Sequence, residues 1–152
     1  METGAKPAWF EDFPAGRVFE FGHASVTEAE IIAFARQFDP QTMHLDPAVA
    51  ANGPTRGLIA SGWHTAALMM RMYAEHVLPE NGLPSPGVDE LRWLVPVRPS
   101  DRLRMRVTIL EARVSQSKPD RGVVRLMSEM LNQNDEVVLS MKPVNLFRRR
   151  SV

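Results

Sequence analysis

The second half of the chain alternates between apolar and polar positions with the two-residue period of a half-buried β-strand. Leu103, Met105, Val107 and Ile109 alternate with arginines and a threonine. Because successive strand residues point to opposite faces, this pattern predicts a strand with one buried and one solvated face. Four more strands are predicted over residues 17–24, 88–95, 122–131 and 136–146, the last two joined by a hairpin connection at 132–135.

The first half shows the period of helices instead. Thr27 and Glu30 have the spacing of a capping box, and apolar residues then recur at helical spacing, so a helix is expected over 27–38. A longer apolar helix is predicted over 61–78. Its first two-thirds carries almost no charge, which predicts burial on nearly all sides. Together these elements predict an α+β fold, with an antiparallel sheet wrapped around the long helix.

Length and composition narrow the class of protein. A chain of 152 residues fits one domain, assigned here to 1–152, with a flexible N-terminal start and a basic C-terminal tail at 148–150. The 18 Lys and Arg residues balance the 18 Asp and Glu residues, which argues against nucleic acid or a membrane surface as a partner.

Cysteine content and hydropathy address the compartment. The chain has no cysteine, which excludes disulfides, thiolate metal sites and cysteine nucleophiles. Its apolar runs are far shorter than the roughly 20 residues that cross a bilayer. With no signal-peptide pattern at its polar start, a cytoplasmic location is expected.

The link after the first predicted helix holds a carboxylate and an imidazole, Asp39 and His44. Pro40 disfavours a helical backbone at Asp39, so the helix should end just before this residue and leave its carboxylate free. Asp46 is expected to cap a second helix, with Pro47 as its first residue. Taken alone, an Asp and a His in such a link more often make turn and surface hydrogen bonds than perform catalysis.

Three motifs follow one another in a recognisable order. Asp39, His44 and Asp46 fit the pattern Asp-x-Asn-Pro-x-His-x-Asp. Ser61 and Gly62 fit a His-Gly or Ser-Gly pair that opens an apolar helix, and residues 96–101 fit a Pro-Val-x-Pro-Gly-Asp turn. On these motifs, and over about residues 10–147, the chain resembles the MaoC-like dehydratases, which are relatives of the (R)-specific enoyl-CoA hydratases.

The resemblance implies a hotdog fold and a hydro-lyase that reversibly hydrates a 2-enoyl thioester, with coenzyme A present only as part of the substrate. Asp39 and His44 would act together as acid and base. The backbone N–H of Gly62, in a first helical turn where amides lack intrahelical acceptors, would polarise the thioester carbonyl. Gln41 and Ser61 are expected to contact substrate. The resemblance also implies no metal or redox cofactor and at least a homodimer.

Two departures keep other functions open. Gln41 and Thr42 stand where the family has Asn and Pro, although Gln offers the same amide from one carbon further out. This favours, as one alternative, a non-catalytic subunit that binds acyl-CoA or joins a heteromeric dehydratase. A hotdog acyl-CoA thioesterase is the other. A metal centre at His44 and Asp46 is rejected because the sequence supplies no third ligand, and the remaining histidines are assigned to packing or to the surface: His23, His64 and His76.

Overall fold

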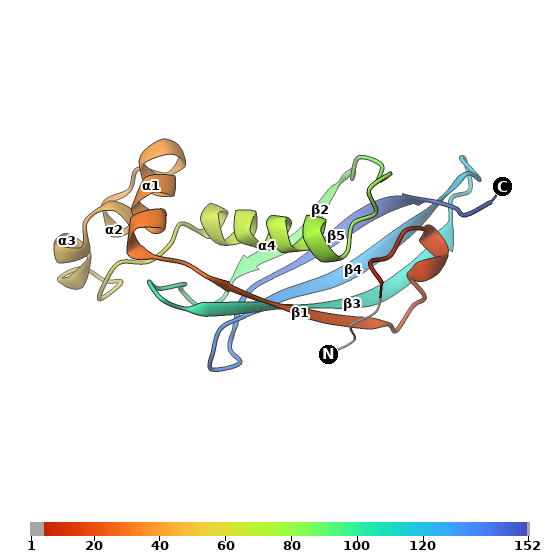
Figure 1. Cartoon of the computed structure of the whole chain (residues 1–152). Helices are drawn as coiled ribbons and strands as arrows, with labels where there is room; N and C mark the ends of the chain where they lie inside the picture. The colour runs from red at the N-terminus through yellow and green to blue at the C-terminus, as the bar shows by residue number, and fades with distance from the viewer. Residues whose placement is uncertain (1–4, 152) are drawn as a thin grey trace.

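The computed structural model describes residues 5–151 and contains one antiparallel sheet with a long helix lying across one face (Figure 1). The strands occur in the spatial order β1-β3-β4-β5-β2, so β1 and β2 form the two edges. This arrangement confirms the predicted α+β class and every predicted strand. Their bounds are β1 (Val18–Ser25), β2 (Gly87–Trp93), β3 (Arg102–Val114), β4 (Arg121–Leu131) and β5 (Val137–Arg148).

Helix α4 (Gly62–His76) is the long apolar helix predicted from the sequence. Met69, Met72 and Tyr73 bury their side chains against the sheet, each such burial contributing roughly 1.5–3 kcal/mol. The hydroxyl of Tyr73 lies 2.6 Å from Oγ of Ser128 on β4, so a buried hydrogen bond also joins the helix to the sheet. Burial raises the pKa of Tyr73, and the phenol stays neutral. These contacts fix the axis of α4 and therefore the place of its N-terminus.

The prediction that α4 is buried on nearly all sides is wrong. Trp63 and Met70 are 58% and 50% exposed, and they share a face with Ala67, which is also exposed. The physical reason is that the sheet of one chain covers only one side of the helix. The absence of charge from this helix therefore marks an apolar face that is open in the single chain.

Three short helices stand beyond the N-terminus of α4, at one end of the sheet (Figure 1): α1 (Glu28–Phe38), α2 (Thr42–Leu45) and α3 (Pro47–Ala51). The capping box is confirmed, since the N–H of Glu30 donates to Oγ1 of Thr27 at 3.2 Å and the N–H of Thr27 donates to Oε2 of Glu30 at 2.8 Å. Asp46 caps α3 as predicted, because its Oδ1 accepts from the N–H groups of Ala48 and Val49.

The two ends of the chain were predicted to be a flexible start and a basic tail. Arg148 is the last residue of β5, and Arg149 and Arg150 pair with Glu11 and Asp12 of the 3₁₀ helix η1 (Phe10–Asp12), so the arginines are not a solvated tail. The predicted flexible start falls largely on residues 1–4, outside the described residues. Over residues 5–151, no helix has the length and hydropathy to cross a membrane.

Candidate active site

Asp39 and His44 are in direct contact. Asp39 is the residue that ends α1, and His44 lies on the single turn of α2, which replaces the irregular link predicted there. Nε2 of His44 is 3.3 Å from Oδ2 of Asp39. The same carboxylate accepts from Oγ of Ser61 at 2.6 Å and from Nε2 of Gln41 at 2.7 Å. Four side chains from three helix ends thus meet at one carboxyl group.

The backbone sets the tautomer of the neutral His44 ring. Its side chain is 4% exposed, and Nδ1 lies 2.8 Å from the carbonyl oxygen of Ile59. Because a carbonyl oxygen can only accept, Nδ1 carries a proton, and in the neutral ring Nε2 is the basic nitrogen. The nitrogen that faces Asp39 is therefore the one that can take up or release a proton.

Hydrogen bonds hold Asp39 in its charged form. Donation from Ser61, and next from Gln41, lowers the pKa of Asp39 below its usual value. The site consequently places a carboxylate that is ionised at neutral pH 3.3 Å from Nε2 of His44, and the two share a hydrogen bond only when Nε2 carries the proton.

Gly62, the first residue of α4, supplies a free donor beside this pair. The N–H of Trp63 donates to Oγ of Ser61, and the N–H groups of His64 and Thr65 donate to the carbonyl of Ser61. Within residues 5–151, the N–H of Gly62 donates to no acceptor. An unpaired amide at a helix N-terminus is suited to a developing negative charge on oxygen.

One cavity of about 540 Å³ connects these groups. Asp39, Gln41, His44 and Gly62 all line it, so four of the five predicted site residues share one volume. Most of the remaining wall is apolar, which suits an acyl chain. Its side chains include Met43, Ile59, Val95, Val97 and Val138.

Ser61 has a different place from the one expected. It is fully buried and does not line the cavity, and its hydroxyl donates to Asp39. The hydrogen bond from Ser61 therefore holds the carboxylate of Asp39 in place. The structure thus places Ser61 next to Asp39, outside the lining of the cavity, and its contact with substrate stays a prediction.

Sequence reasoning missed two tryptophans. Trp63 and Trp93 line the cavity and pack edge to face, with ring centroids 5.1 Å apart. Trp63 was included in a helix expected to be buried, and Trp93 ends a strand far along the chain. An aromatic residue next to the Ser-Gly pair was the available signal for Trp63, but no local pattern linked Trp93 to the site.

Comparison with known proteins identifies the family of this chain. The MaoC-like domain family model matches residues 12–130. The chain belongs to this family. A MaoC-like dehydratase from Rhodospirillum rubrum is 40% identical, with a TM-score of 0.90, over 96% of this chain and 100% of that chain.

Two further relatives extend the comparison. The uncharacterized protein YdeM of Bacillus subtilis is 28% identical over 82% of this chain and 88% of its own length. The (R)-hydratase PhaJ1 from Pseudomonas aeruginosa, at 23% identity, has a TM-score of 0.77 over 95% of this chain and 88% of that chain. This MaoC-like chain therefore has the hotdog fold predicted from its motifs.

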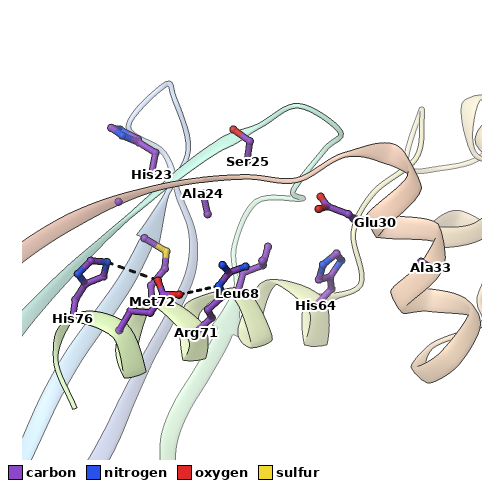
Figure 2. Close-up of a pocket in the computed structure, with 12 residues that line it drawn as sticks. His23, Ala24, Ser25, Glu30, Ala33, His64, Leu68, Arg71, Met72 and His76 are labelled. Carbon is purple, nitrogen blue, oxygen red and sulfur yellow. Dashed lines mark hydrogen bonds and ion pairs between the residues drawn. The ribbon is translucent and has the colours of Figure 1, made fainter. Parts of the chain in front are cut away.

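A second cavity, of about 710 Å³, lies on the other side of α4. Figure 2 shows His64, Arg71 and His76 on α4 across the cavity from β1, where Ala24 points toward the helix and His23 and Ser25 point away from it. Within residues 5–151, no three His, Asp, Glu or Cys side chains are placed to hold a metal ion, here or elsewhere. Nor does this cavity contain the contact between a carboxylate and a buried imidazole that marks the first one.

The second cavity does contain a buried histidine, His64. Its ring stacks on Phe34 at 4.6 Å between centroids, as its assignment to packing predicted. Its Nδ1 is buried and has no hydrogen-bond partner among residues 5–151. Burial lowers the pKa of His64 below its usual value, an effect only partly opposed by the nearby Glu30 carboxylate.

The burial of His64 predicts a loss of stability in mild acid. Below a pH of about 6.5 the unfolded chain takes up a proton at this residue that the folded chain resists, so stability present above that pH is lost as pH falls. His64→Phe keeps a ring against Phe34 and is expected to reduce the fall in unfolding free energy between pH 7.5 and 5. Urea unfolding at both pH values measures this. His23→Phe, at an exposed position, is the control, and an equal pH dependence in both variants would contradict the prediction.

Proposed function

We propose that this MaoC-like protein is a hydro-lyase that reversibly adds water to a 2-enoyl thioester and forms a 3-hydroxyacyl thioester. The supporting observation is the contact between Asp39 and His44 beside the unpaired N–H of Gly62, in one apolar cavity. Coenzyme A is the proposed thiol carrier, and the reaction requires no further cofactor.

The chemistry follows from the three groups. Water adds its oxygen to the β carbon and the α carbon gains a proton, so one proton must leave the water and one must be delivered. Asp39 and His44 can hold the water and exchange both protons on one face of the substrate, such positioned groups contributing about 10²- to 10⁴-fold each. As negative charge develops on the thioester oxygen, the N–H of Gly62 stabilises it. Gln41 holds Asp39 with its amide nitrogen, which leaves its amide oxygen for water or substrate.

The test is hydration of crotonyl-CoA and of a panel of longer and branched enoyl-CoAs, which is monitored as a loss of the absorbance of the conjugated thioester. A thiol-reactive dye measures release of free coenzyme A in a parallel assay. We expect the absorbance to fall without thiol release. Release of free coenzyme A would instead identify a thioesterase. Binding of acyl-CoA without turnover would identify a non-catalytic subunit, and either result would overturn the proposal.

A homodimer is part of this proposal. The exposed face of α4 adjoins β2, an edge strand whose outer backbone groups have no partner strand in the single chain. Exposed apolar side chains and an unpaired strand edge are together suited to covering by a second copy.

Ser61→Ala tests the support of the carboxylate. Loss of the hydroxyl removes the main cause that lowers the pKa of Asp39, so the acid limb of the rate profile should move to higher pH. With a hydrogen bond to a charged group lost, kcat/KM at neutral pH should fall about tenfold. The pH dependence of kcat/KM measures both effects. An acid limb that stays in place would contradict the role given to Ser61.

A further inference from the structure

Trp93, the last residue of edge strand β2, is tied to the first residue of α4. Its indole N–H donates to the carbonyl oxygen of Gly62 at 2.8 Å. The strand end beneath it is fixed, since Trp93 pairs with Leu139 on β5 and the N–H of Leu94 donates to the carbonyl of Val138. The hydrogen bond therefore connects the sheet to the turn of helix that carries the proposed carbonyl-binding amide.

The indole also occupies the space that a side chain at position 62 would need. A Cβ on Gly62 would lie 2.5 Å from Cε2 and 2.6 Å from Nε1 of Trp93, closer than non-bonded carbon atoms approach in proteins. The sequence suggested that Gly62 leaves room for a thioester. In the structure, the room beside its α carbon is taken by Trp93.

We propose that Trp93 is a positioning residue, which holds the Gly62 backbone so that its N–H points at the thioester carbonyl, and that its ring is the reason for glycine at this position. The inference rests on the proposed function and adds to it the residue that holds the oxyanion donor. A donor assists catalysis only when its direction is fixed before the charge develops. The N–H of Gly62 shares a peptide group with the carbonyl of Ser61, which accepts from His64 and Thr65, and the hydrogen bond from Trp93 fixes the next peptide group, at the carbonyl of Gly62.

Trp93→Phe tests the hydrogen bond, because it keeps an aromatic ring and removes the donor. We expect kcat for crotonyl-CoA hydration to fall about tenfold with KM changed by less than about twofold, the pattern of an interaction that matters mainly in the transition state. Trp9→Phe is the matched control, since Trp9 precedes η1 and does not line the cavity. Two-dimensional ¹⁵N–¹H spectra give a readout independent of activity: the Gly62 amide resonance should move in Trp93→Phe and stay in place in Trp9→Phe.

A double-mutant cycle tests the steric half of the proposal. Gly62→Ala should lower the melting temperature by several degrees in the wild-type background, because the new methyl group meets the indole. In a Trp93→Ala background the same change should be neutral or raise the melting temperature, since Ala is otherwise the better helix former. Equal melting losses in both backgrounds would overturn the inference.

The remaining outcomes separate this inference from the proposed function. An unmoved Gly62 resonance together with an unchanged kcat in Trp93→Phe would overturn the positioning role. A wild-type protein that hydrates none of the enoyl-CoAs would refute the proposed function instead. In that case the amide spectrum and the melting cycle would still decide whether Trp93 orients Gly62.

Discussion

Asp39→Asn and His44→Gln are each expected to lower kcat for enoyl-thioester hydration by about 10²- to 10⁴-fold, because each removes one member of the proton-exchanging pair. Asn keeps the shape of Asp39 but cannot accept a proton at neutral pH. Gln retains a donor near the carbonyl of Ile59 but lacks a nitrogen that can be both base and acid. Steady-state rates on crotonyl-CoA at saturating substrate measure both losses.

Asp46→Asn provides the matched control for these variants. Asp46 belongs to the same motif, but its Oδ1 is occupied in capping α3, and Asn caps a helix about as well as Asp. Activity should therefore stay close to wild type. Full activity in both Asp39→Asn and His44→Gln would contradict the assignment, whereas a loss confined to one variant would show that the other group is replaced by water.

Asp39→Asn also disturbs the hydrogen bonds around the carboxylate. The carboxylate of Asp39 is shared by Ser61, Gln41 and His44, so Asp39→Asn also leaves the hydroxyl of Ser61 with a weaker acceptor. The loss in Asp39→Asn should accordingly exceed the tenfold loss predicted for Ser61→Ala. The order of the two losses in kcat/KM separates the chemical role of the carboxylate from the support given to it.

Local signals in the sequence predicted most of the fold. The capping box at Thr27 and the cap at Asp46 are formed by neighbouring residues, so spacing was enough to find both. The full length of β3 was not predicted. Its alternation is interrupted by the register shift between Ile109 and Glu111, after which the inward and outward positions exchange. A two-residue period therefore ends at Ile109, although the strand continues to Val114.

Only the site residues that lie in short sequence motifs could be predicted. Asp39, His44 and Gly62 fall in short patterns, and the structure brings them to one cavity. Trp93 was missed because its contact with Gly62 joins a strand end to a helix start 31 positions away. The sequence also could not show where the hydroxyl of Ser61 points. A serine suits a helix N-cap and a hydrogen-bond donor to Asp39 equally well.

The exposed face of α4 could not be predicted for a different reason. Its burial depends on whether a second copy of the chain covers it. The hydrophobic pattern of a helix is the same whether its apolar face packs on the sheet of its own chain or on a second copy. Only the exposure of Trp63 and Met70 in the folded chain separates these cases. That exposure supports the homodimer.

Met70→Glu is expected to convert the proposed homodimer to monomers. A charge buried without a partner costs about 3–5 kcal/mol, which would weaken association by about 10²- to 10⁴-fold. Sedimentation velocity over a range of protein concentrations measures the shift. Leu110→Glu, at a similarly exposed apolar position on β3, is the control and should leave the dimer intact. A wild-type chain that is monomeric at tens of micromolar, or equal behaviour of the two variants, would exclude the dimer.

The same substitution should also lower activity, although Met70 does not line the cavity. Trp63, Trp93 and Leu94 line that cavity and are about half exposed, so its mouth opens on the apolar surface that the second copy would cover. A monomer would keep Asp39 and His44 in place but leave this mouth open to water. Bulk water weakens the electrostatic stabilisation that Gly62 can give. Hydration per chain by Met70→Glu should therefore rise with protein concentration as the dimer re-forms, whereas Leu110→Glu should show a constant specific rate.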